Sequence, residues 1–192
     1  MPLYFAYGAN INREAMARRC PRSKTLGLAR LARHRLAAMR EGWLTAVRDP
    51  RASVHGILWD VALSDVPALD RYEGLAHGLY TKVAQPVLTG PGPRRALVYF
   101  GANDGPGALR PDYLAEILAA ARAWPLPVDA IAALERLGEG SSGVGRYGAS
   151  AGQAPGDSVA QFAAASVGAA PVAPPRLSHM FGSSWAWRLK NW

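Results

Sequence analysis

The stretch Leu69-Asp70-Arg71-Tyr72-Glu73-Gly74-Leu75 lies between two apolar runs of the kind that form strands. Its glycine favours a turn, so we expect the backbone to reverse there and to present Glu73 at an edge of the fold. Apolar and aromatic neighbours would desolvate this carboxylate and raise its pKa, which suits it to move a proton near neutral pH. Glu73 is therefore the first candidate base. A solvated glutamate beside a capping glycine is the alternative interpretation.

β-prone runs lie on both sides of this stretch. We expect strands at 3–7, 24–31, 34–39, 43–47 and 54–61, with a turn at Asp49-Pro50, and a hairpin of strands at 80–88 and 95–100. A helical interpretation of 24–39 stays open because alanine and leucine favour helices. Gly56, in the clearest of these strands, indicates a bulge or a close approach of two backbones.

The other periodic segments predict helices. They lie at 10–19, entered through an asparagine cap, at 65–72 after Ser64, at 113–124 and at 128–137. The strands occur mostly in hairpins and the helices lie at the margins. This order predicts an α+β domain built on a mostly antiparallel, barrel-like sheet with flanking helices.

The composition changes at residue 138. Residues 138–192 form a Gly-, Ala-, Ser- and Pro-rich segment that ends in a basic stretch with several tryptophans. Small side chains cannot offset the entropy of an ordered chain, so we expect a domain at 1–137 and a flexible tail at 138–192. Its end fits a basic amphipathic segment for a membrane surface or a partner, a segment folded back onto the domain, or a non-native extension.

Bulk properties narrow the classes of function. The chain has 192 residues, 49% of them hydrophobic, which is enough for a sizeable core, and no run of about twenty apolar residues predicts a membrane span. A single cysteine, Cys20, and an N-terminus without a signal pattern favour the cytoplasm. The formal charge of +8 would attract acidic partners. No recognition motif accompanies it, so we expect no nucleic-acid partner.

Motifs for several common chemistries are missing. The histidines are scattered, no Cys/His spacing resembles a zinc site, and the sequence has no phosphate-binding loop, dinucleotide fingerprint or nucleophile elbow. We therefore expect no metal and no cofactor. The oligomeric state stays open.

A second candidate site lies in the turn after the first strand. The backbone N–H groups of Gly8, Ala9 and Asn10, with the first turn of the following helix, can point at one spot and bind an anion such as a carboxylate. A plain strand-to-helix connection with nothing bound is the alternative.

Short motifs across residues 2–137 resemble those of the γ-glutamylcyclotransferase-like (AIG2-like) proteins. Tyr4-Phe5-Ala6-Tyr7-Gly8-Ala9-Asn10 resembles the family signature YFAYGSN, with Ala9 in place of its serine. Residues 54–59 and 69–74 resemble the family's strand and LDxxEG segments, and Tyr80 falls in its GxYxxxxV motif. Residues 113–134 resemble its closing helix, with the turn at 124–127. Several short motifs in the same order are together specific.

The resemblance implies an enzyme that converts a γ-glutamyl amino acid or γ-glutamyl amine into 5-oxoproline and the free amino acid or amine. It implies that Glu73 is the general acid/base and that the substrate-binding residues are Tyr4, Phe5, Ala6, Tyr7, Gly8, Ala9, Asn10 and Tyr80. The hydroxyl groups of Tyr7 and Tyr80 would orient the glutamyl group. Because Ala9 lacks the serine hydroxyl, a non-catalytic module that binds a small acidic ligand is the alternative. A basic nucleic-acid adaptor is a third hypothesis.

Overall fold

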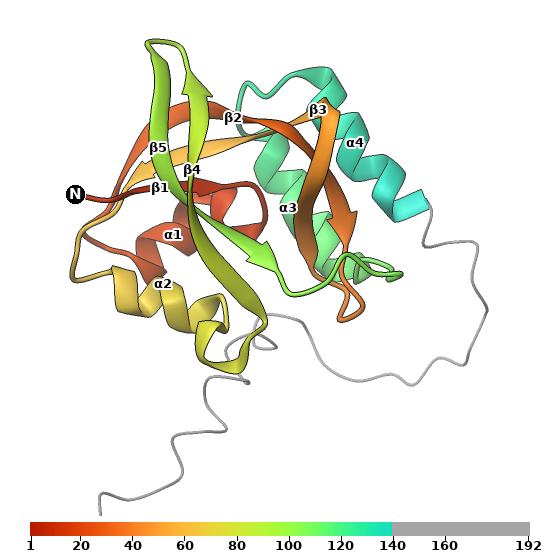
Figure 1. Cartoon of the computed structure of the whole chain (residues 1–192), viewed down its shortest axis with the longest axis horizontal. Coiled ribbons are helices and arrows are strands. Elements are labelled where there is room, and N and C mark those ends of the chain that lie inside the picture. The colour runs from red at the N-terminus through yellow and green to blue at the C-terminus, as the bar shows by residue number, and fades with distance from the viewer. Residues whose placement is uncertain (140–192) are drawn as a thin grey trace, which may run out of the picture.

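The computed structural model describes residues 1–139 (Figure 1). In chain order the elements are β1 Leu3–Ala6, η1 Ala9–Ile11, α1 Arg13–Arg19, β2 Lys24–Ala38, β3 Leu44–Asp60, α2 Val66–Tyr72, η2 Leu75–His77, β4 Tyr80–Thr89, β5 Gly92–Gly101, α3 Pro111–Arg122 and α4 Val128–Glu139. The tail predicted at 138–192 lies outside the described residues, except that Gly138 and Glu139 complete α4.

The strands close into a barrel in the order β1-β3-β2-β4-β5. Each recorded pair is antiparallel apart from β1 with β5. Two long hairpins, β2–β3 and β4–β5, supply most of the ladder. β1 and β5 pair at Tyr4 and Leu97, and β2 and β4 pair at Arg30 and Leu88. The predicted α+β class, with a mostly antiparallel barrel and flanking helices, is confirmed.

The β2–β3 hairpin corrects two expectations. β2 is one bulged strand, with Arg33 at φ 59°, so the helical interpretation of 24–39 is wrong. β3 runs through Asp49-Pro50, so the turn predicted there is wrong as well. The register passes from Ala32 opposite Ser53 to His34 opposite Arg48. Pro50 therefore lies in a local interruption of the ladder, where a residue without an N–H is tolerated.

Gly56 marks a close contact between β3 and β1. A Cβ at this position would lie 2.1 Å from the carbonyl oxygen of Ala6 and 2.9 Å from Cζ of Phe5. No side chain fits there, so the close approach that the sequence suggested is confirmed. It fixes β1 against β3, and the residues that follow β1 are held with it.

The helices lie around the barrel, and α3 packs against α4 (Figure 1). α1 is capped by Asn12, whose side-chain oxygen accepts hydrogen bonds from the N–H groups of Glu14 and Ala15. Asn10, the expected cap, lies instead in η1. α2 begins after Asp65 rather than Ser64. Within residues 1–139, none of the helices combines the length and hydropathy that crossing a membrane requires.

The main core fills the barrel and the space under the helices. Its fully buried large side chains include Phe5, Ile11, Met16, Leu31, Met39, Leu44, Ile57, Leu69 and Ile117. Leu69 belongs to α2, and its burial holds this short helix against the barrel. The end of α2 is thereby placed beside β1.

Candidate active site

A cavity of about 500 Å³, its open mouth included, lies where β1, the segment after it and the end of α2 meet. Its wall consists of Tyr4, Tyr7, Gly8, Ala9, Asn10, Trp43, Leu44, Tyr72, Glu73, Leu79, Tyr80, Tyr99 and Tyr113. Tyrosine rings dominate this wall, and Glu73 is the one carboxylic acid in it.

Glu73 follows the last turn of α2, and its backbone N–H donates to the carbonyl of Leu69 at 3.0 Å. Gly74, at φ 63°, then turns the chain away. The side chain of Glu73 is buried, so the interpretation as a solvated turn residue is wrong. Its Oε1 accepts hydrogen bonds from the hydroxyl of Tyr4 at 3.2 Å and from Nδ2 of Asn10 at 2.8 Å.

The environment of Glu73 favours the protonated carboxyl more than water does. Burial raises its pKa to about 7, although the hydrogen bond from Tyr4, the charge of Arg19 and the hydrogen bond from Asn10 act in the opposite direction. Both forms of the carboxyl are therefore well populated at neutral pH. A group with this property can accept a proton and return it.

Asn10 contacts Glu73 through its side chain, which sequence reasoning missed. The side chain is almost fully buried, and its Nδ2 also lies 3.0 Å from the hydroxyl of Tyr4. Its Oδ1 accepts a hydrogen bond from Nη1 of Arg19. The guanidinium of Arg19 lies over the ring of Tyr72, 3.3 Å from its centroid. No motif in the sequence singles out Arg19, because its partners lie in other elements of the fold.

Tyr7 and Tyr80 line the cavity, as expected, but their hydroxyl hydrogens are used elsewhere. The hydroxyl of Tyr7 donates to the carbonyl of Tyr99 at 2.5 Å, and that of Tyr80 donates to the carbonyl of Leu44 at 2.7 Å. Burial raises the pKa of both groups, so they stay neutral. In this structure they are anchored wall residues, and only their oxygen lone pairs are left for a ligand.

The turn after β1 also reaches the cavity. Gly8, Ala9 and Asn10 lie in its wall, so this part of the predicted substrate site meets Glu73. A Cβ on Gly8 would lie 3.1 Å from the hydroxyl of Tyr113, so there is little room for a larger side chain at position 8. Phe5 and Ala6 do not belong to the wall. They are fully buried, because their strand is pressed against β3 at Gly56.

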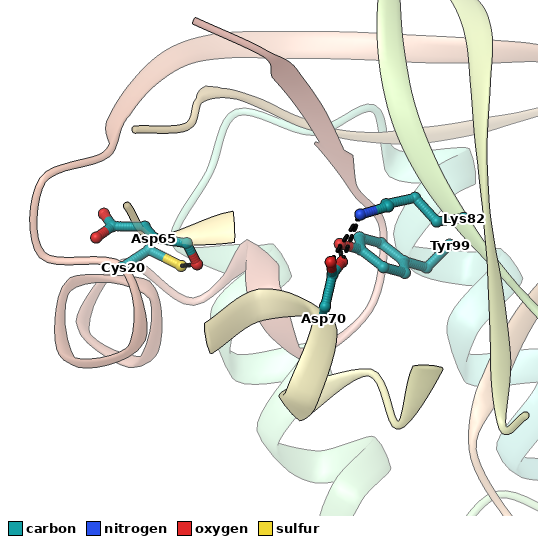
Figure 2. A network of polar contacts seen from close by, with 5 residues as sticks. All are labelled: Cys20, Asp65, Asp70, Lys82 and Tyr99. Atoms are coloured by element: carbon teal, nitrogen blue, oxygen red, sulfur yellow. Dashed lines mark hydrogen bonds and ion pairs between the residues drawn. The ribbon is translucent and has the colours of Figure 1, made fainter. Parts of the chain in front are cut away.

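A polar network holds α2 against the barrel (Figure 2). The carboxylate of Asp70 accepts hydrogen bonds from Nζ of Lys82 at 2.7 and 2.8 Å and from the hydroxyl of Tyr99 at 2.5 Å. The ring of Tyr99 packs edge-on against that of Tyr4, with centroids 5.5 Å apart. The network links α2, β4 and β5 beside Glu73. Figure 2 also shows the Cys20 thiol directed at the backbone oxygen of Asp65.

Metal ligands are not grouped in the described part of the chain. Among residues 1–139, no three His, Cys, Asp or Glu side chains come together in a way that could hold a metal ion.

Solved structures with this fold share its architecture. A structure described as a gamma-glutamyl cyclotransferase superposes with a TM-score of 0.66 at 23% identity, over 84% of this chain and 96% of that one. YkqA from Bacillus subtilis gives a TM-score of 0.62 at 20% identity, over 72% of this chain and 54% of that one. At these identities the likeness shows a common fold.

Sequence comparisons are more specific. The mouse gamma-glutamylcyclotransferase is 32% identical over 97 residues, 45% of this chain and 52% of that protein, and the bovine protein is 31% identical over the same extent. The chain thus spans about half the length of these curated relatives. The family model for "Gamma-glutamyl cyclotransferase, AIG2-like" matches residues 4–117, which include Tyr4, Asn10, Glu73 and Tyr80. Since this match extends over more than half of the chain, the chain belongs to the gamma-glutamyl cyclotransferase, AIG2-like family.

Proposed function

We propose that this protein is a γ-glutamylcyclotransferase that converts a γ-glutamyl amino acid or γ-glutamyl amine into 5-oxoproline and the free amino acid or amine. The observation that carries the proposal is Glu73: a buried carboxylate, the one acid in the wall of a small aromatic cavity, with a pKa of about 7. The reaction needs a group of this kind, because the substrate's α-ammonium must lose a proton before its nitrogen can attack.

The magnitude of the pKa matters for this step. An α-amino group has a pKa of about 8, so proton transfer to Glu73 costs only about 1.4 kcal/mol. Transfer to a glutamate with the ordinary pKa of 4.5 would cost about 5 kcal/mol. Burial of Glu73 thus removes most of the cost of generating the nucleophile.

The amine then attacks the γ-carbonyl carbon of the same molecule and closes a five-membered ring. Glu73 returns the proton to the departing nitrogen as the original amide C–N bond breaks. The ring nitrogen, which carries two hydrogens after the attack, gives up one of them to the released amine or to solvent, so that the products are 5-oxoproline and the free amine. The cavity would contribute by holding the glutamyl chain in a curled conformation. The main-chain N–H groups at 8–10 are the candidate donors for the α-carboxylate or the developing oxyanion.

The test is an assay for 5-oxoproline with a panel of γ-glutamyl amino acids and γ-glutamyl amines. We expect the wild-type protein to form it and Glu73→Gln to lose at least about 100-fold in kcat. The matched control is Glu14→Gln, on the exposed side of α1. If folded Glu73→Gln and the wild type are equally active, Glu73 is not the base.

Ala9 supports a second candidate function, the binding of a small acidic ligand without turnover. Ala9 lies in the cavity wall and offers no hydroxyl there. Thermal stabilisation of the wild type by panel compounds, with no 5-oxoproline formed by any of them, would favour this candidate over the enzyme.

A further inference from the structure

Arg19 lies behind the cavity wall rather than in it. Its guanidinium makes two recorded contacts, a hydrogen bond from Nη1 to Oδ1 of Asn10 and a stacking contact on the ring of Tyr72. Both partners belong to the wall, whereas Arg19 itself does not. The side chain therefore touches the site only from outside, through Asn10 and Tyr72.

The hydrogen bond to Asn10 determines which way the amide points. An arginine can only donate, so it pairs with the amide oxygen and excludes the flipped orientation, in which the NH₂ group would face it. With the oxygen held by Arg19, Nδ2 is directed at Oε1 of Glu73, 2.8 Å away. In the flipped orientation, the amide oxygen would face the Glu73 carboxylate and repel it.

We propose that Arg19 is a positioning residue, which holds the Asn10 amide with its nitrogen toward Glu73 and so keeps that carboxylate available as a proton acceptor. The catalytic meaning of this role rests on the proposed function. The contacts themselves can be tested without turnover.

Charged and titratable groups surround Glu73 from several elements. They are Tyr4 on β1, Tyr7 after it, Arg19 on α1, Cys20 at its end, Asp70 and Tyr72 on α2, Tyr80 on β4, Tyr99 on β5 and Tyr113 on α3. Burial and the charge of Asp70 both raise the pKa of Glu73, while the charge of Arg19 lowers it. Asp70 is already paired with Lys82 and Tyr99, which leaves Arg19 as the cation that acts on Glu73 in this set.

The experiment replaces Arg19 with methionine, which has a similar length and no charge. The matched control is Arg18→Met, at the preceding residue of α1. The side chain of Arg18 is exposed, and its Nη1 lies 3.9 Å from Oε2 of Glu14. The pKa of Glu73 is read by ¹³C NMR titration of its side-chain carboxyl, and the resonance is assigned by its absence in Glu73→Gln. We expect Arg19→Met to raise this pKa by about one unit and Arg18→Met to leave it unchanged.

Two further variants separate positioning from bulk charge. Arg19→Lys keeps the positive charge but lacks the planar guanidinium group, so we expect it to shift the Glu73 pKa less than Arg19→Met does. If circular dichroism shows that Arg19→Met is unfolded, Arg19→Lys is used in its place. In an Asn10→Ala background, removal of Arg19 should shift the Glu73 pKa less than it does in the wild type, because there is no Asn10 amide left for Arg19 to orient. The acid limb of kcat/KM should move with the NMR value.

The proposal is overturned if Arg19→Met leaves the Glu73 pKa unchanged, if Arg18→Met shifts it equally, or if the Arg19 shift is the same with and without Asn10. These outcomes are distinct from failure of the proposed function. A shifted Glu73 pKa in a protein that forms no 5-oxoproline would support the positioning role and remove the enzyme assignment. Turnover that depends on Glu73 but not on Arg19 would support the enzyme assignment and remove the positioning role of Arg19.

Discussion

The ionised form of Glu73 is the one that the proposed reaction needs, but it lowers the stability of the folded protein. Its pKa is about 7 in the fold, against an ordinary value of 4.5, so the folded state keeps a proton that the unfolded chain releases between these two values. The free energy of unfolding therefore does not depend on Glu73 ionisation below pH 4.5, and it decreases as the pH rises from 4.5 to about 7. Above pH 7 the loss amounts to about 3 kcal/mol.

Replacement of this carboxylate should stabilise the protein in alkaline conditions. We expect Glu73→Gln to have a higher free energy of unfolding than the wild type at pH 8, and the difference to shrink toward pH 5, where Glu73 is protonated in the fold. Urea denaturation at both pH values measures it. A constant difference between pH 5 and pH 8 would contradict the assigned titration.

Catalysis should depend on the same proton. If Glu73 acts as the base, kcat/KM rises with pH, with a midpoint near 7, because only the ionised carboxylate accepts a proton. A pH profile from 5 to 8 with one substrate of the panel checks this. A midpoint near 4.5 would mean that the active carboxyl is solvated in the working enzyme.

Individual residues differ in how far the sequence predicts them. The turn and its apolar neighbours were enough to single out Glu73 and to predict its raised pKa. The side chain of Asn10 was not predictable in the same way, because an asparagine before a helix resembles a cap and Asn12 takes that role. Its partner Glu73 is 63 residues away in the chain, so only the closed barrel brings the two together.

At the scale of elements, local signals gave the type of most segments and misplaced some of their boundaries. The hairpin of β4 and β5 and the helices α3 and α4 follow from alternation, turn residues and apolar periodicity. Asp49-Pro50 is a strong turn signal, yet both residues lie inside β3. Pairing with the long strand β2 is present on both sides of them, at Arg48 and at Ser53, so β3 continues across the interruption and the tertiary pairing outweighs the local preference.

The junction of β1 and β3 gives a prediction at this scale. Gly56→Ala would place a methyl group against the Ala6 carbonyl, so we expect it to lower the free energy of unfolding by about 3 kcal/mol. The matched control is Gly90→Ala, where a Cβ has no neighbour within 4 Å and the backbone is not left-handed. Thermal melting of both variants measures the effect. Equal melting temperatures would show that β1 can move away from β3 without cost.

For the whole molecule, the barrel-like sheet was predictable from the order of the segments, with strands mostly in hairpins and helices at the margins, whereas the strand pairs that close the barrel were not. The main core, the cavity and the helices that flank the barrel all belong to residues 1–139. The proposed domain at 1–137 ends inside α4, whose last residues extend to Glu139.

This gives a prediction for a shortened chain. If the proposed domain at 1–137 is the folded unit, a protein that ends at Glu139 should melt at the same temperature as the full chain and form 5-oxoproline at the same rate, because it keeps Glu73, Tyr4 and Asn10. Calorimetry and the product assay test it side by side. A lower melting temperature or a slower rate would assign a role to residues 140–192.

The barrel closes along two seams, each recorded as a single residue pair, and one of these pairs contains Tyr4. Amide hydrogens at the seams should therefore exchange with deuterium sooner than those within the long hairpins. Since Tyr4 also donates to Glu73, we expect opening of this seam to disturb one of the two hydrogen bonds that the carboxylate accepts. On warming, turnover should consequently decline before the far-ultraviolet signal of the barrel changes.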